Sequence, residues 1–213
     1  MEHSEDKSIQ ASAIFNKYAE EYQNRFMNVD LYKDCLNTFC DTIRQKSPKV
    51  LDIACGPGNF AKYLLRRRPD LLLFGLDLAP SMIDLAKRNN PNAHFEVMDC
   101  RCIDKLVQKF NAVICSFCLP YISSDDVNHL IDNIGSLLLE KSVLYISTIE
   151  GTYTNSRYEK SNKGDLMFMH YYNEAYLTKE LKKNGFSISD ISRKENVIGN
   201  GKKVIDLIII ARK

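Results

Sequence analysis

The chain has 213 residues, of which 45% are hydrophobic and 26% charged, and its formal net charge is +2. This length suits one substantial domain with an apolar core, alone or with an appendage. A charge so close to balance argues against a nucleic-acid-binding protein, which concentrates basic residues on one face. No apolar run is long enough to span a membrane, and the polar start lacks the apolar core of a signal peptide. We therefore expect neither a nucleic-acid nor a membrane partner.

The seven cysteines are an odd number, and several stand inside apolar runs. This usage favours reduced thiols over a disulfide framework, and hence a cytoplasmic protein. Cys115-x-x-Cys118 has the spacing of one metal-binding hook, but Cys100-x-Cys102 makes a poor second hook for zinc. We expect no metal site.

Before residue 47 the sequence is helical in pattern. Apolar and aromatic residues recur at three- and four-residue steps across 9–32, which predicts one amphipathic helix. A second helix is expected over 32–46. It ends at Ser47-Pro48, because proline disfavours helix in the residue before it.

From residue 49 onward, expected strands and helices alternate. Strands are predicted at 49–53, 71–77, 94–98, 112–117 and 143–148, with helices at 60–68, 80–90 and 124–139 and a short helix or loop at 103–109. This alternation predicts a doubly wound parallel sheet with right-handed crossovers.

The C-terminal part departs from that alternation. A helix over 177–184 precedes two strand patterns, 186–197 and 203–211, joined by a short polar link, so these strands should pair antiparallel. The polar segment 150–172 shows little periodicity, and we interpret it as a long loop over the sheet.

A glycine-containing turn follows the first expected strand. Val50 to Phe60 runs from apolar residues through Asp52 into a turn with Gly56 and Gly58, whose missing side chains let backbone N–H groups approach a ligand. Asp52, Asp77 and Asp99 stand at the ends of three successive strands, the edge at which doubly wound sheets bind ligands. We expect these carboxylates to converge on one ligand.

This arrangement resembles the class I S-adenosylmethionine-dependent methyltransferases, in particular those that act on small molecules. The family motif is Asp/Glu-x-Gly-x-Gly-x-Gly, and Asp52-Ile53-Ala54-Cys55-Gly56-Pro57-Gly58 matches it with alanine in place of the first glycine. The match by motif covers roughly 50–119. The resemblance implies an α/β, Rossmann-like, doubly wound and mostly parallel seven-stranded sheet with a C-terminal antiparallel strand pair. It also implies S-adenosylmethionine as cofactor and S-adenosylhomocysteine as product.

The resemblance implies a cofactor role for each matching position. Asp77 would accept hydrogen bonds from the two ribose hydroxyls, a task that suits an acceptor-only carboxylate. The other implied positions are Asp52 ahead of the turn; Ala54, Cys55, Gly56 and Gly58 against the methionine and ribose portions; Leu78 and Met82 near the adenine; Asp99 at the adenine amino group with Cys100 beside it; and Cys115, Ser116 and Phe117 at the methionine end.

Similar family members carry a tyrosine-rich N-terminal helix that closes over the cofactor and part of the acceptor site. By this resemblance residues 1–46 would form a helical lid and 47–213 the cofactor-binding methyltransferase domain. Tyr18 and Tyr22 would face the cofactor, and Arg25 would meet its carboxylate. The alternative is an ordinary amphipathic helix packed on the domain.

The acceptor side is less defined. Phe117-Cys118-Leu119-Pro120-Tyr121 stands where branches that methylate amines carry Asn/Asp-Pro-Pro-Tyr, which favours another small-molecule acceptor and places Tyr121 at the substrate. Methyl transfer needs alignment first and a general base only for a protonated acceptor. The candidates for a base are His170 and Tyr172, with Tyr171 as a further substrate neighbour; a packed, non-catalytic His170 is the alternative.

Two other functions fit parts of the pattern. Gly56-Pro57-Gly58-Asn59-Phe60-Ala61 also satisfies the dinucleotide fingerprint of NAD-dependent oxidoreductases. Asp52, Asp99 and the terminal antiparallel pair favour the methyltransferase. A non-catalytic cofactor-binding module of the same fold is the second alternative, and the intact turn and acids favour the enzyme. We expect a monomer or a homodimer.

Overall fold

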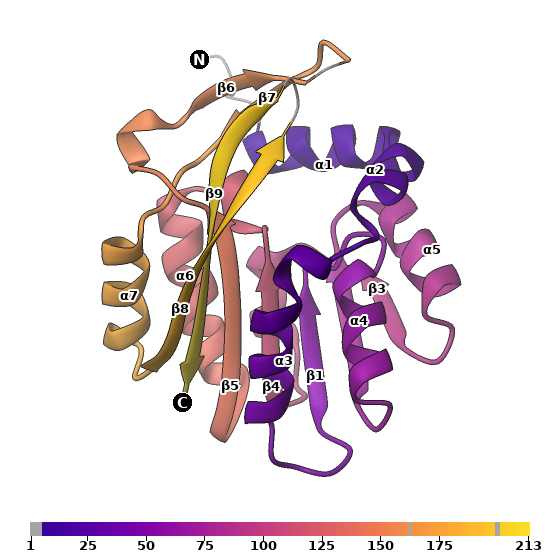
Figure 1. Ribbon diagram of the computed structural model, residues 1–213, viewed down its shortest axis with the longest axis vertical. Helices are drawn as coiled ribbons and strands as arrows, with labels where there is room; N and C mark the ends of the chain where they lie inside the picture. The colour runs from indigo at the N-terminus through magenta and orange to yellow at the C-terminus, as the bar shows by residue number, and fades with distance from the viewer. Residues whose placement is uncertain (1–5, 162, 199–200) are drawn as a thin grey trace.

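A seven-stranded sheet forms the centre of the computed structural model, which describes residues 6–161, 163–198 and 201–213 (Figure 1). The strand order is β3-β2-β1-β4-β5-β9-β8. The strands are β1 (Lys49–Ile53), β2 (Leu72–Asp77), β3 (His94–Val97), β4 (Phe110–Ser116), β5 (Leu138–Ile149), β8 (Ser187–Ile198) and β9 (Lys202–Arg212). The first five pair in parallel, and β9 runs antiparallel to both β5 and β8. The expected fold class is confirmed.

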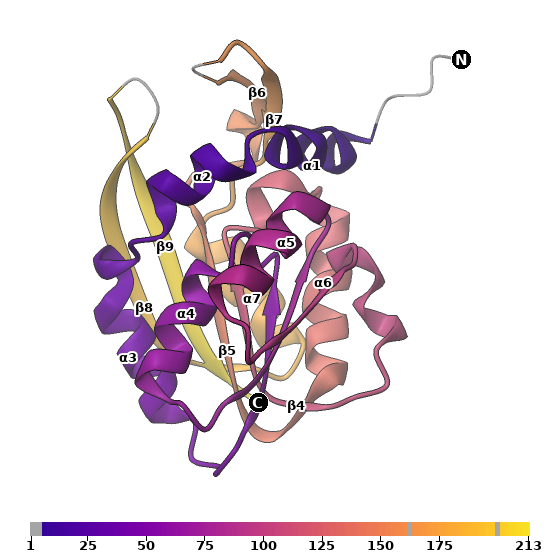
Figure 2. The ribbon, with the colours of Figure 1, turned by 90° about the vertical axis from the view of Figure 1, so that its right-hand side faces the viewer.

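Helices cover both faces of the sheet, and two further helices lie across its carboxyl edge (Figures 1 and 2). The helices are α1 (Lys7–Lys17), α2 (Ala19–Phe26), α3 (Lys33–Thr42), α4 (Asn59–Arg67), α5 (Pro80–Asn89), α6 (Ser124–Leu137) and α7 (Glu174–Lys183), with short 3-10 turns η1 (Asp30–Tyr32), η2 (Cys100–Lys105), η3 (Leu119–Tyr121) and η4 (Tyr153–Asn155). No helix in the described part of the chain is both long and apolar enough to cross a membrane.

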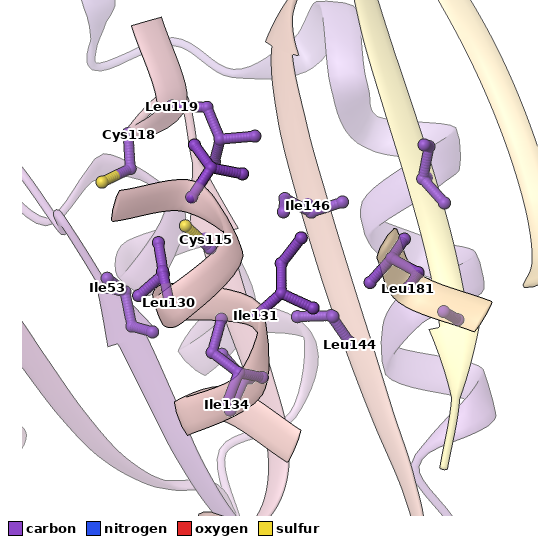
Figure 3. Packing of buried hydrophobic residues seen from close by; sticks show 14 of the residues in the cluster. Ile53, Cys115, Cys118, Leu119, Leu130, Ile131, Ile134, Leu144, Ile146 and Leu181 are labelled. Atoms are coloured by element: carbon purple, nitrogen blue, oxygen red, sulfur yellow. The ribbon is translucent and has the colours of Figure 1, made fainter. Parts of the chain in front are cut away.

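Two apolar layers hold the sheet between its helices. On one face, α6 and α7 pack Leu130, Ile131 and Leu181 against strand residues such as Ile53 and Ile146 (Figure 3). On the other face, α3 and α4 pack against the same strands. Because both faces are buried, the central strands are almost continuously apolar, as β4 is from Ala112 to Cys115.

The N-terminal region differs from the single helix expected over 9–32. It is divided at Tyr18, whose φ of −116° and ψ of 30° are not helical and which ends α1 by donating its N–H to the Ile14 carbonyl oxygen. The break lets α1 and α2 both lie on α5, while α1 also contacts the strand β7 (Leu166–Met169). The spacing of apolar residues continues unchanged past Tyr18, so the sequence pattern did not indicate the break.

The expected long loop over 150–172 contains a β-hairpin. β6 (Arg157–Lys160) pairs antiparallel with β7, around a turn in which Gly164 adopts a φ of 95°. The two strands are short and largely exposed, so their pattern lacks the alternation of a half-buried strand. The hairpin lies beside α1, above the carboxyl edge of the sheet (Figure 2).

Three other elements have bounds that differ from those predicted from the sequence. β5 begins at Leu138 instead of 143, since the chain passes straight from α6 into the strand, with Lys141 at a φ of 60°. The turn η2 occupies part of the segment read as helix or loop. α7 begins at Glu174, three residues early, because the Asn173 side chain accepts a hydrogen bond from the Tyr176 N–H and caps it.

Gly58, the residue before helix α4, has both a backbone conformation and close neighbours that require glycine. Its φ is 76°, and a Cβ there would stand 2.4 Å from Asn90 Nδ2 and 3.2 Å from Ala86 Cα. We expect Gly58→Ala to lower the free energy of unfolding by about 2 kcal/mol or more, because strain and overpacking add. Gly185→Ala is the control: its φ is 81° with nothing within 4 Å, so it should cost about 1 kcal/mol. Urea unfolding measures both, and equal losses would contradict the packing argument.

Candidate active site

The turn between β1 and α4 has a left-handed backbone at three positions. Ala54, Gly56 and Gly58 have φ values of 56°, 54° and 76°. Ala54 stands where the family motif has its first glycine, and it adopts the conformation that glycine would favour. The methyl group is accommodated because it faces a cavity.

Asp77, at the end of β2, holds this turn in place. Its Oδ2 accepts a hydrogen bond from the Gly56 N–H at 2.9 Å, and its Oδ1 accepts one from the Ala79 N–H at 2.8 Å. Burial raises the pKa of Asp77, although these backbone donors partly offset the effect. Each carboxylate oxygen has a second lone pair. Asp77 can therefore accept two further hydrogen bonds.

Asp52 lies in β1 and is buried, with 1% of its surface exposed. Its Oδ2 has no hydrogen-bond partner in the described structure. Burial, and then the charge of nearby Asp77, raise the pKa of Asp52 well above its ordinary value. An orphaned buried carboxyl group is costly unless it is protonated or meets a cation or a donor.

Asp99, which follows β3, is bound by Arg101. Its Oδ2 accepts from Arg101 Nη2 at 2.6 Å, and its Oδ1 accepts from the Arg101 N–H at 2.9 Å. Burial raises the pKa of Asp99, but the bonds from Arg101 outweigh it, so the pKa lies below its usual value. Arg101 Nη1 also donates to Asp6 Oδ2 at 2.7 Å, and Asp6 caps α1. One arginine thus joins this strand end to the N-terminal helix.

A cavity of about 100 Å³ lies between the strand ends and the two N-terminal helices. Eleven of the residues singled out from the sequence line it: Tyr22, Ala54, Gly56, Asp77, Leu78, Met82, Asp99, Cys100, Ser116, Phe117 and Tyr121. Residues far apart in the chain are therefore brought together at one edge of the sheet, as the doubly wound topology predicts.

Other candidates lie elsewhere. Asp52 in β1 and Cys55 within the turn are both buried. Gly58 faces α5, and Cys115 is packed among Ile53, Leu130 and Ile131 (Figure 3). Tyr18 and Arg25 line a separate outer groove. Their proposed cofactor roles remain untested predictions.

The three consecutive aromatic residues proposed for the acceptor site do not line the cavity. His170 is 5% exposed and stacks on Tyr153, with ring centroids 5.7 Å apart. Burial, and then the charge of Lys7, lower the pKa of His170. The Tyr171 hydroxyl donates to Glu159 Oε1, and the Tyr172 hydroxyl donates to the Ile122 carbonyl oxygen, each at 2.6 Å.

Sequence reasoning missed seven lining residues. Four form the inward face of α1, and three follow strands at the sheet edge: Ser8, Ala11, Ser12 and Phe15, and Met98, Cys118 and Ile122. The α1 residues follow a helical step of three or four, but small and hydroxyl side chains are not apolar signals. Cys118 Sγ lies 3.6 Å from Cys100 Sγ. Nevertheless, no cluster of three or more metal-ligating side chains occurs within the described ranges.

The sequence shows similarity to known methyltransferases. Residues 50–141 match the family described as methyltransferase domain. The chain is 34% identical over 109 residues to protein 235L of Invertebrate iridescent virus 6, which is named as a methyltransferase; the match covers 51% of this chain and 40% of that protein. It is 29% identical over 110 residues to the demethylmenaquinone methyltransferase of Thermotoga maritima, a match that covers 50% of this chain and 48% of that protein. The aligned part thus amounts to less than half the length of either relative.

Solved structures resemble the whole chain. The 1,6-didemethyltoxoflavin-N1-methyltransferase of Burkholderia thailandensis superposes with a TM-score of 0.73 and 18% identity, over 100% of this chain and 91% of that one. Magnesium protoporphyrin IX methyltransferase of Synechocystis PCC 6803 superposes with a TM-score of 0.72 and 17% sequence identity, over 100% of both chains. Fold and site together define a Rossmann-like α/β protein whose one antiparallel strand in the main sheet, β9, lies between β5 and β8. Residues 50–141 match the methyltransferase domain family, and the chain as a whole shares the fold of S-adenosylmethionine-dependent methyltransferases.

The buried Asp52 makes a testable contribution to pH dependence. A carboxyl group whose pKa is raised by folding adds stability below its unfolded pKa and loses it as pH rises through the folded pKa. Asp52→Asn removes this titration. We therefore expect the ligand-free variant to gain stability relative to the unmodified protein as the pH rises above about 4, the ordinary pKa of an aspartate side chain. Urea unfolding across this range measures it, with Asp132→Asn, on the exposed face of α6, as control. Parallel curves for all three proteins would refute the assignment.

Proposed function

We propose that the protein transfers a methyl group from S-adenosylmethionine to a small-molecule acceptor. The observation that carries this proposal is the carboxylate of Asp77, with two acceptor positions left at the wall of the cavity and the glycine turn beside it. Two vicinal ribose hydroxyls would satisfy both positions. The relatives named above support the activity.

The residues present fit the cofactor. Asp77 would bind the ribose, Leu78 and Met82 would pack on the adenine, and the turn at Ala54 and Gly56 would lie against the methionine portion. The orphaned carboxyl group of Asp52, beneath that turn, suits the positive charges of the cofactor's methionine end. The bound cofactor supplies an electrophilic methyl group on a sulfonium sulfur.

The chain's own part in the reaction is alignment and exclusion of water. Phe15, Tyr22 and Tyr121 are packed edge to face, with ring centroids 5.6 Å apart for Phe15 and Tyr22 and 4.9 Å apart for Phe15 and Tyr121. These rings would border the path between methyl group and acceptor. Neither His170 nor Tyr172 lines the cavity, so the proposed mechanism rests on alignment and does not use either as a base.

Residues 1–46 would act as the lid of residues 47–213. The cavity of about 100 Å³ is smaller than the roughly 300–1,000 Å³ typical of ligand pockets. Helices α1 and α2 form its outer wall (Figure 2). Cofactor entry would therefore require them to move, and the Arg101–Asp6 ion pair would hold them closed.

Substitution of Asp77 tests the proposed cofactor site. Asp77→Ala should weaken S-adenosylhomocysteine binding by at least about 100-fold, because two buried hydroxyls lose a charged acceptor. Isothermal titration calorimetry measures the affinity. Asp84→Ala, on the exposed side of α5, is the matched control and should bind normally. Unchanged affinity in Asp77→Ala would remove this residue from the site.

The proposed lid is tested by breaking its ion pair while keeping the helix cap. Asp6→Asn retains a side chain that caps helices well but loses the charge paired with Arg101. We expect S-adenosylhomocysteine to dissociate about two- to fivefold faster, in line with loss of one partly exposed ion pair. Stopped-flow fluorescence measures the rate. Asp41→Asn breaks the remote ion pair with Arg67 and should change nothing; equal rates in all three proteins would argue against the lid.

A non-catalytic module would bind the cofactor equally well. Turnover separates the two functions: conversion of S-adenosylmethionine to S-adenosylhomocysteine in the presence of a metabolite panel supports the enzyme. We further propose, from the sequence, that the protein is cytoplasmic and that it is a monomer or a homodimer.

A further inference from the structure

An outer groove of about 440 Å³ lies between the N-terminal helices, the β6–β7 hairpin and the ends of β8 and β9. Its walls are largely apolar and aromatic: Ile14, Phe15, Tyr18, Tyr22, Phe26, Met167, Met169 and Ile198. Methionine side chains adapt to ligands of different shape, and aromatic rings offer flat apolar surfaces. This composition suits an apolar body with rings or a flexible chain.

The outer groove adjoins the cofactor cavity. Phe15 and Tyr22 line both spaces, and Phe15 also packs against Tyr121, which lines the cavity. The pKa of the Tyr22 hydroxyl is raised to about 12 by burial and then by the charge of Asp77. The hydroxyl is therefore neutral at physiological pH. The uncharged Phe15 and Tyr22 rings therefore form the border that the groove shares with the cavity.

The charges lining the groove are unequal. Four side chains are cationic and two are carboxylates: Arg25, Lys160, Lys163 and Lys202, and Glu21 and Glu159. Glu159 Oε1 accepts from Lys202 at 2.7 Å, from Arg157 at 2.9 Å and from the Tyr171 hydroxyl at 2.6 Å, so this carboxylate is fully compensated. Lys163 lies 3.8 Å from Glu21.

Two cations of the groove are left without a carboxylate. Within the described residues, neither Arg25 of α2 nor Lys160 of β6 forms an ion pair. The Arg25 guanidinium lies over the Phe26 ring, 4.9 Å from its centroid. The nearby Asp165 is bound by Lys17 at 3.2 Å. The groove thus combines an apolar wall with uncompensated positive charge.

We propose that the outer groove binds the methyl acceptor, and that this acceptor is an apolar molecule with an anionic group. Its apolar body packs on Phe15, Met167 and Met169, and its anion meets Arg25 of α2 and Lys160 of β6, which both line the groove. The inference rests on the proposed function: the acceptor's nucleophilic atom must pass beside the Phe15 and Tyr22 rings and bond to the methyl carbon as the sulfur–methyl bond breaks, which leaves S-adenosylhomocysteine in the cavity. It adds the chemical class of the acceptor, which neither the family nor its motifs specify.

Two fluorescent probes with one ring system test this inference. 8-Anilinonaphthalene-1-sulfonate carries an anion, and N-phenyl-1-naphthylamine is the same body without it. With the cofactor cavity saturated by S-adenosylhomocysteine, we expect the sulfonate to bind at least about fivefold more tightly than the neutral probe, as two exposed charge pairs allow. In the double variant Arg25→Gln with Lys160→Gln this preference should disappear, with the affinity of the neutral probe unchanged.

A matched charge control is Lys62→Gln with Arg66→Gln, on the exposed face of α4, which removes the same charge away from the groove. It should keep the preference for the sulfonate. Equal binding of both probes to the unmodified protein, or a preference that survives in the groove variant, would overturn the inference. Calorimetry with S-adenosylhomocysteine is a separate readout: if that ligand fails to bind the unmodified protein, the proposed function fails, whereas normal binding without an anion preference refutes only the acceptor class.

Discussion

The hydrogen bond between the Gly56 N–H and Asp77 joins the two strand ends on which the whole site is built. A left-handed turn is unfavourable for most residues, and this one persists because its backbone donor is fixed from the neighbouring strand. Asp77 in turn is positioned by the Ala79 N–H at the entrance to α5. One carboxylate therefore fixes the turn and the start of a helix, and it also lines the cavity.

The same edge gathers three carboxyl groups, of which Asp52 and Asp77 form no ion pair within the described residues. Asp52 is buried and Asp77 is partly exposed, and desolvation raises the pKa of both carboxyl groups. Only Asp99 has a cation of its own, Arg101. Such an edge is poorly satisfied by itself and favours a ligand with donors and positive charge. The electrostatic character of the site thus agrees with the cofactor proposed for it.

The fold could be predicted from the sequence because its signals are local. Buried strands contain short apolar runs, such as residues 112–115 of β4. The place of Asp77 at the strand ends followed from topology, whereas Phe117 was indicated only by the resemblance to the methyltransferase family. The β6–β7 hairpin and the break at Tyr18 did not, since they depend on contacts between segments distant in the chain: α1 on β7, and α2 on α5. The inward face of α1, with Ser8 and Ser12, was hidden for the same reason.

The N-terminal helices are tied to both sides of the molecule. Asp6 meets Arg101 beside the cofactor cavity, whereas Lys17 meets Asp165 in the hairpin turn that borders the outer groove. Under the proposed function, helices α1 and α2 both enclose the cofactor and form one wall of the acceptor site. Binding would then be ordered. S-adenosylmethionine would bind first, the acceptor would bind next and complete the closed state, and S-adenosylhomocysteine would dissociate last. Steady-state kinetics would be of the compulsory-order type, a kinetic property that arises from two ion pairs at opposite ends of one helix.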